Sequence, residues 1–151
     1  MTAQQLRRAD KVLTGIGYAA YPALLAYVAI VRPSLLLACI IVPAASFLII
    51  TGLRALINAE RPYESTDAPN LLDKQTKGKS FPSRHVASLF IIASSWLLVC
   101  EPVGMVLCIV GCAMAAIRVK GGAHHARDVV AGAVFAFVLC AVGYALAYPF
   151  I

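Results

Sequence analysis

Long apolar runs alternate with short polar segments along this chain. Five stretches carry no charged residue, namely 12–31, 33–53, 86–100, 102–117 and 129–151. A helix rises about 1.5 Å per residue and the hydrocarbon core of a bilayer is about 30 Å thick, so roughly 20 apolar residues span it. The pattern therefore predicts five transmembrane helices. The third and fourth stretches are short, and we expect each to gain a turn at its polar end.

Composition agrees with a membrane protein. Of the 151 residues, 61% are hydrophobic and 13% are charged, and the mean hydropathy is +0.83. Soluble domains are about 45–50% apolar and 25% charged. These values argue against a water-soluble domain and against a disordered chain. We expect one all-α domain over residues 1–151, a polytopic helix bundle in the cell membrane.

Several residues in the apolar stretches also have a predicted role. Stretch 12–31 is too long for the apolar part of a signal peptide and precedes no obvious cleavage site, so we interpret it as a permanent span. Pro22, Pro43 and Pro149 are predicted to kink helices, since proline removes a helical hydrogen bond. All five cysteines lie in or beside apolar stretches, where packing is a better interpretation than zinc binding.

Charge is strongly one-sided in this arrangement. Five spans place the N-terminal tail and the loops 54–85 and 118–128 on one side of the membrane. That side holds twelve of the 13 Lys and Arg residues and all three histidines. Ionisable groups at a membrane boundary are costly unless they are hydrated or partnered. The asymmetry therefore indicates an active face, a topology signal, or both.

The first polar segment contains two arginines on one helical face. Arg54 and Arg61 are seven residues apart, which is close to two turns. A guanidinium is permanently charged, and its planar fork of donors suits phosphate oxygens. The structural alternative is that both side chains snorkel to the membrane interface.

The second segment precedes an apolar stretch directly. Phe81-Pro82-Ser83-Arg84-His85 places Ser83 where a helix N-cap is expected. The free N–H groups at a helix start bind anions, and His85 beside them is able to donate a proton near neutral pH. An ordinary serine cap with an exposed histidine is the alternative.

The third segment offers a histidine and a carboxylate. Gly121-Gly122 permits a tight turn. On a helix, His124 and Asp128 are four residues apart and close enough to hydrogen-bond, which fixes the imidazole tautomer and leaves the other nitrogen free. His125 is three residues before Asp128 and competes for it, so spacing alone does not choose between the two histidines. A structural pair at a helix start is the alternative.

Together these segments resemble the motif blocks of the type 2 phosphatidic acid phosphatases, membrane relatives of bacterial acid phosphatases and vanadium haloperoxidases. Arg54 through Arg61-Pro62 matches a first block of a basic residue, six residues and Arg-Pro, with Arg where Lys is usual. The segment 82–85 matches Pro-Ser-Gly-His, with Arg84 in place of glycine. The third block is Ser-Arg, five residues, His, three residues, Asp. It selects His124 over His125, and Ile117 stands in place of serine.

The resemblance implies hydrolysis of a lipid phosphomonoester or pyrophosphate without a metal or cofactor. In that family pattern His124 is the nucleophile that becomes a phosphohistidine, Asp128 orients it, and His85 protonates the leaving group. The phosphate would be held by Arg54, Arg61, Ser83, Arg84 and Arg118. Arg84 either adds a phosphate contact or screens the pocket. Polyprenyl phosphate or pyrophosphate, phosphatidylglycerol phosphate and phosphatidic acid are the candidate substrates.

Two alternatives stay open at this stage. The same cationic face would also suit a protein that binds or transports a lipid headgroup or an anion without chemistry. In either case the expected partners are membrane lipids, not nucleic acid. The resemblance places the active face outside the cytoplasm. Without the four candidate site arginines, however, 8 of the remaining 9 Lys and Arg residues lie on that face, and this tally favours the cytoplasm.

Overall fold

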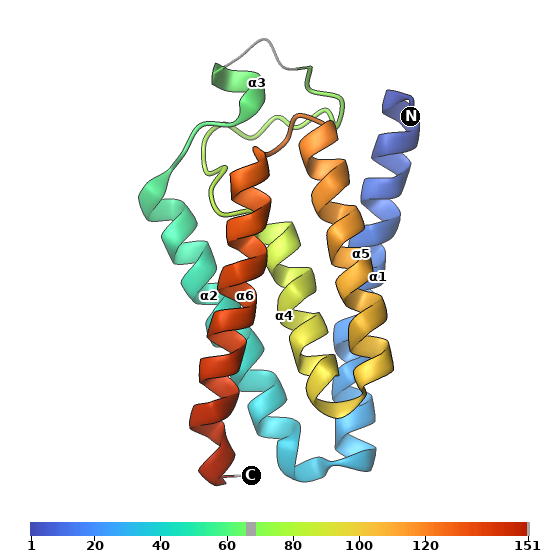
Figure 1. The fold of residues 1–151 in the computed structure, drawn as a ribbon, viewed down its shortest axis with the longest axis vertical. Coiled ribbons are helices and arrows are strands. Elements are labelled where there is room, and N and C mark those ends of the chain that lie inside the picture. The colour runs from blue at the N-terminus through green and yellow to red at the C-terminus, as the bar shows by residue number, and fades with distance from the viewer. Residues whose placement is uncertain (66–68, 151) are drawn as a thin grey trace.

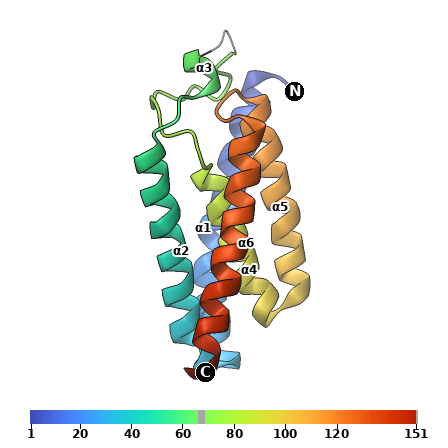
Figure 2. The same cartoon turned by 60° about the vertical axis from the view of Figure 1, so that its left-hand side comes forward.

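The structure, a computed structural model, describes residues 1–65 and 69–150. Its long helices run side by side as a bundle (Figure 1; Figure 2). They are α1 (Ala3–Val31), α2 (Leu36–Ile57), α4 (Arg84–Val99), α5 (Glu101–Lys120) and α6 (Ala126–Ala147). Three short helices complete the described part, namely η1 (Pro33–Leu35), α3 (Pro62–Ser65) and η2 (Tyr148–Phe150).

The all-α membrane bundle expected from the sequence is confirmed. The regions of α1, α2, α5 and α6 are long and apolar enough to cross a membrane, whereas α4 has 16 residues. Helix α4 packs against α1, α2, α5 and α6. Its side chains Val86, Phe90 and Ile91 are buried in the main core. Because α4 is surrounded by other helices, protein rather than lipid covers most of it.

Helix ends differ from the ends of the charge-free stretches. Helix α1 begins at Ala3 instead of residue 12, and Thr2 caps it. Thr2 Oγ1 accepts from the Gln5 backbone N–H at 3.3 Å, and the Gln5 side chain accepts from the Thr2 N–H at 2.8 Å. A run without charge marks the part of a helix that fits in lipid, and the helix itself continues into the polar zone. At their polar ends α5 gains three residues, 118–120, which is close to the expected turn, whereas α4 gains only Arg84 and His85.

Two of the three prolines expected to kink helices lie inside them. Helices α1 and α2 continue through Pro22 and Pro43. Pro149 lies instead in the 3₁₀ turn η2, so the expectation of a kinked helix there is wrong. Proline has no N–H to donate to the preceding turn, and the α-helix ends two residues before it.

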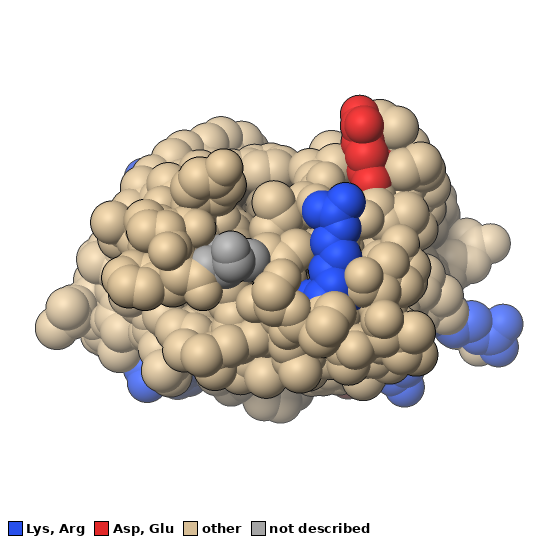
Figure 3. All heavy atoms as spheres, turned by 90° about the horizontal axis from the view of Figure 1, so that it is seen from below, with Lys and Arg blue, Asp and Glu red and all other residues tan. Residues whose placement is uncertain are grey.

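The outer surface of the bundle is apolar. Large hydrophobic side chains are exposed on every long helix, among them Ile30, Leu48, Leu98, Ile109 and Leu146. The end opposite the N-terminus carries few charged side chains (Figure 3); the turns there contain Arg32 and Glu101. An apolar outer surface of this kind is stable in lipid rather than in water. The chain is therefore a multi-pass membrane protein.

Candidate active site

The candidate site lies at the N-terminal end of the bundle, where the α2–α4 and α5–α6 connections meet (Figure 1). Glu64 of α3 organises the longer connection, since its carboxylate accepts from the Arg61 N–H at 2.9 Å and from the Gly78 N–H at 2.8 Å. The shorter connection turns at Gly122, which has φ +73°. A Cβ at Gly122 would lie 2.4 Å from the Pro69 carbonyl oxygen, so only glycine fits this close approach.

His124 and Asp128 lie close together at the start of α6, and Ser80 joins them. His124 Nδ1 is 3.6 Å from Asp128 Oδ2. The Ser80 hydroxyl donates to the same oxygen at 2.5 Å and lies 3.3 Å from His124 Nδ1. With its proton on Nδ1, the ring points that proton toward the carboxylate and keeps a lone pair on Nε2.

His125 occupies a different position from His124. It is the N-cap residue of α6, and its backbone N–H donates to Asp128 Oδ2 at 3.0 Å. Asp128 therefore contacts both histidines, but through the ring of His124 and the backbone of His125. The ambiguity left by sequence spacing is resolved in favour of His124 as the ring beside the carboxylate.

His124 is buried among cations, which determines its protonation. Burial lowers the pKa of His124 from its ordinary value of 6.5; the neighbouring Asp128 carboxylate opposes this shift, while Arg61, Arg118 and Arg54 add to it. Each cation disfavours a second positive charge on the ring. His124 is therefore neutral at neutral pH, as a nucleophilic imidazole must be.

Arg54 and Arg61 approach the histidine from α2 and the following loop. Arg54 is in the last turn of α2, buried, with Nη1 3.4 Å from the Pro82 carbonyl oxygen. Arg61 donates from Nε to the Gly78 carbonyl at 3.1 Å and from Nη1 to the Ala123 carbonyl at 3.1 Å. Arg61 thus connects the two loops next to His124.

Ser83 has the predicted N-cap position in α4 but does not cap the helix with its side chain. Its backbone N–H donates to the Asp128 carbonyl at 2.9 Å, which ties the second motif block to the third. Its hydroxyl is fully buried, and no hydrogen-bond partner is found for it among the described residues. A buried hydroxyl in this state is suited to an anionic ligand.

Arg118, from the last turn of α5, is paired with a residue that the motif analysis did not consider. Its Nε lies 2.8 Å from Asp10 Oδ1, and both side chains are buried. Lys74 Nζ lies 3.3 Å from the other Asp10 oxygen. Helix α1 therefore contributes a carboxylate that contacts one of the candidate phosphate-binding arginines.

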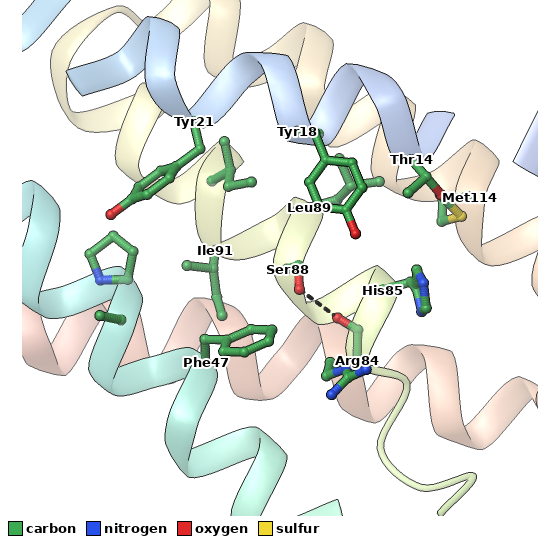
Figure 4. Close-up of a pocket in the computed structure, with 14 residues that line it drawn as sticks. Thr14, Tyr18, Tyr21, Phe47, Arg84, His85, Ser88, Leu89, Ile91 and Met114 are labelled. Atoms are coloured by element: carbon green, nitrogen blue, oxygen red, sulfur yellow. Dashed lines mark hydrogen bonds between the residues drawn. The ribbon is translucent and has the colours of Figure 1, made fainter. Parts of the chain in front are cut away.

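Arg84 and His85 begin α4 and line a groove of about 480 Å³ between α1, α2 and α4. Figure 4 shows both side chains at one end of this groove, with Tyr21 farther along it. The Arg84 guanidinium lies 5.8 Å from the centre of the Phe47 ring. Most other lining residues are apolar.

His124 lines a separate pocket of about 340 Å³, formed with residues of both connections such as Pro69, Gly122 and His125. His124 and His85 therefore border different cavities. They are nevertheless near neighbours, because His85 lies within electrostatic range of His124 and Arg118.

The structure thus brings the three motif blocks together at one end of the bundle. Arg54, Arg61 and Arg118 lie within electrostatic range of His124, and Arg84 lies against Phe47 in the groove instead. Sequence reasoning missed Ser80 and Asp10. Asp10 had a usable signal, since it is the first acidic residue of the chain and precedes the next by 50 positions. Ser80 had none, because a serine in a polar loop is ordinary.

The fold also occurs in a solved structure. The crystal structure of LpxE from Aquifex aeolicus superposes with a TM-score of 0.73 at 21% sequence identity, covering 95% of this chain and 94% of that one. Among curated proteins, no sequence matches this chain. The model of the PAP2 superfamily matches residues 34–150, which include all three motif blocks. This chain therefore belongs to the PAP2 superfamily.

Proposed function

We propose that this protein is a membrane phosphatase that removes the terminal phosphate of a lipid through a phosphohistidine on His124. The observation that carries the proposal is the position of His124. It is neutral, lies beside Asp128 and Ser80, and is within electrostatic range of Arg54, Arg61 and Arg118. A structural histidine does not require three arginines around it, whereas a transferring phosphoryl group does.

In the first step, His124 Nε2 attacks phosphorus. A P–N bond forms as the bond from phosphorus to the leaving oxygen breaks, and the electron pair stays on that oxygen. Burial and the nearby cations, Arg118 first among them, lower the pKa of His85 to about 3 in this structure. In this proposal the negative charge of the bound substrate offsets those cations and raises that pKa, so that His85 takes up a proton and donates it to the departing group. Asp128 stabilises the positive charge that develops on the imidazole.

In the second step, water attacks the phosphohistidine and phosphate departs. Neutral His85 accepts the proton of the attacking water and is restored, and His124 returns to its neutral form. The arginines and the Ser83 hydroxyl hold the phosphoryl oxygens in both steps. Among the described residues, no three His, Cys, Asp or Glu side chains are grouped closely enough to hold a metal ion, and we assign charge stabilisation to the arginines.

A lipid is the substrate class that the surroundings support. The groove beside His85 is lined by apolar side chains from three membrane helices, including Phe47, Leu89 and Ile92. Its polar end, with Arg84 and His85, lies next to the cationic site. A hydrocarbon chain would occupy the apolar part while the phosphate reaches the arginines.

The test is phosphate release by the full-length protein in detergent from a panel of lipid phosphates and pyrophosphates, with a chelator present. We expect turnover, and we expect His124→Asn to lower it by at least about 10³-fold, because the attacking group is lost. His125→Asn is the matched control and should retain most of the activity. Acid-labile radioactivity on the protein, after mixing with a labelled substrate, would identify the phosphohistidine.

Two results would contradict the proposal. Turnover retained in a folded His124→Asn variant would refute the nucleophile. Tight binding of vanadate or phosphate with no hydrolysis of any lipid in the panel would instead favour a non-catalytic protein that binds or transports a headgroup. Loss of activity on chelation would refute metal independence alone.

A further inference from the structure

Arg84 stands apart from the other arginines of the site. Arg54, Arg61 and Arg118 act electrostatically on His124, whereas Arg84 is exposed in the groove and lies against the Phe47 ring. No acidic side chain lies within ion-pair distance of Arg84 in the described part of the chain. Its charge is therefore uncompensated, at a place where the first helix turn of α4 adds positive potential.

The geometry of displacement determines which part of a substrate meets Arg84. In phosphoryl transfer the attacking and leaving atoms lie roughly in line on opposite sides of phosphorus. His85, the proposed proton donor to the leaving group, lines the groove, whereas the buried His124 borders the pocket beside the two connections. With His124 attacking, the leaving group departs on the groove side, where His85 and Arg84 are adjacent (Figure 4).

A neutral leaving group has little use for a guanidinium. When a lipid monophosphate is hydrolysed, the departing group is an alkoxide. A proton from His85 neutralises it to an alcohol. When a lipid diphosphate is hydrolysed, the departing group is a phosphate that carries about −1.5 to −2 charge at neutral pH. A guanidinium binds such a group by two parallel hydrogen bonds.

The charge distribution of the site fits this second phosphate. Arg54 lies within electrostatic range of Arg61, Arg84 and Arg118, so Arg84 adds a repulsive interaction to a site that already holds three guanidiniums. One phosphate on the His124 side leaves Arg84 unpaired. A second phosphate in the groove would compensate the positive charge of Arg84.

We infer that Arg84 binds the departing phosphate and makes this enzyme prefer lipid diphosphates to lipid monophosphates. The inference rests on the proposed function and specifies its substrate. His124 attacks the terminal phosphorus of the diphosphate, and the bond from that phosphorus to the bridging oxygen breaks. The bridging oxygen keeps the electron pair and leaves as part of a lipid monophosphate, paired with Arg84. Water then releases inorganic phosphate from His124.

The experiment compares farnesyl diphosphate with farnesyl monophosphate, which share one chain and differ by one phosphate. The full-length protein in detergent is assayed for phosphate release as wild type, Arg84→Gly and Arg84→Gln. We expect the wild type to have the higher kcat/KM on the diphosphate. Both substitutions should lower the ratio of the two kcat/KM values about tenfold or more, since a charged hydrogen-bonded pair is lost for one substrate only.

Two further variants separate a specific effect from a general one. Arg32→Gln removes one positive charge at the opposite end of the bundle and should leave the ratio unchanged. His85→Asn should move the ratio the other way, because an alkoxide needs a proton far more than a departing phosphate does. A disturbance of folding would depress both substrates in parallel and would not produce opposite shifts.

The outcomes distinguish this inference from the proposed function. Hydrolysis of neither farnesyl compound, together with no hydrolysis of any lipid in the panel of lipid phosphates and pyrophosphates, would refute the proposed function. Hydrolysis of other lipids in the panel but of neither farnesyl compound would overturn only the preference for diphosphates. If the wild type hydrolyses both substrates and Arg84→Gly lowers kcat/KM equally on the two, the role of Arg84 is overturned and the phosphatase activity stands. A wild-type preference for the monophosphate would overturn it as well.

Discussion

Ser80 lies between His124 and Asp128, the two side chains that the motif spacing predicts to contact each other directly. Its hydroxyl donates to Asp128 Oδ2 at 2.5 Å and lies 3.3 Å from His124 Nδ1, while the ring and the carboxylate are 3.6 Å apart. All three side chains are buried. Ser80 thus helps to hold the carboxylate in the position that orients the imidazole.

For Ser80→Ala we predict a fall in kcat of about tenfold, because the loss of one hydrogen bond to a buried charged group is worth about 1.5–3 kcal/mol. Steady-state phosphate release measures it. Ser94→Ala is the control, since Ser94 Oγ only donates to the Phe90 carbonyl of its own helix. Equal activity of the two variants would show that Asp128 orients His124 without Ser80.

The lowered pKa of His124 predicts how kcat/KM depends on pH. Because burial lowers this pKa below 6.5, the neutral nucleophile persists at neutral pH and is lost only when the pH falls through the lowered value. We expect the acid limb of kcat/KM to lie below pH 6.5. Profiles with a monophosphate and a diphosphate separate this limb from substrate ionisation. A shared limb above pH 6.5 would contradict the neutral state of His124.

At the scale of elements, α1 is the helix whose contribution to the site was least expected. Leu6 packs with Ile117 and Ala123 in a small core at the polar end. Asp10, one turn later, reaches Arg118 at the end of α5. The first, polar turns of α1 therefore extend beyond the lipid and pack on the site. A search for charge-free stretches does not detect them, because they contain charged residues.

Asp10→Asn should loosen this contact. Removing one partner of a buried ion pair leaves Arg118 and Lys74 uncompensated, and we expect a destabilisation of about 3 kcal/mol together with a higher KM. Thermal unfolding in detergent and steady-state kinetics measure the two effects. Asp73→Asn is the control, because its pair with Arg7 is at the surface at 3.4 Å and should be worth about 1 kcal/mol or less. A lower KM in Asp10→Asn would mean that Asp10 competes with phosphate for Arg118.

The helices themselves followed from hydropathy, but not all their details. The length and position of the apolar runs were sufficient for α2 and α6, and α5 reached a full span by extending its short run at both ends. Helix α4 was shorter than a typical span, and only its burial among four helices explains why it is stable at 16 residues. The contact between α4 and α6 depends on Gly132, where a Cβ would lie 2.7 Å from the Ser83 carbonyl oxygen.

For the whole molecule, the two ends of the bundle differ in charge. The site end holds the N-terminus and the α2–α4 and α5–α6 connections, and the C-terminus lies at the other end (Figure 1). Helices and turns at the far end contribute Arg32 and Glu101, whereas twelve of the 13 Lys and Arg residues belong to the site end. Basic residues are retained on the cytoplasmic side of bacterial inner membranes and similar bilayers.

We therefore predict that the site faces the cytoplasm and the C-terminus faces outward. Green fluorescent protein fused at the C-terminus should then be dark, while the same protein fused at the N-terminus should fluoresce. Alkaline phosphatase at the C-terminus should be active. A fluorescent C-terminal fusion would place the site outside, as the family resemblance suggests.

The amino-acid sequence by itself determined the membrane bundle, the sidedness of its charge and the three motif blocks, because these depend on local composition and spacing. Tertiary structure decided which groups meet. The hydrogen bond of Ser80 to Asp128, the pairing of Asp10 with Arg118 and the direction of Arg84 into the groove join residues far apart in the chain or depend on how a helix is rotated. No periodicity encodes such contacts, since they arise only when several helices pack at once.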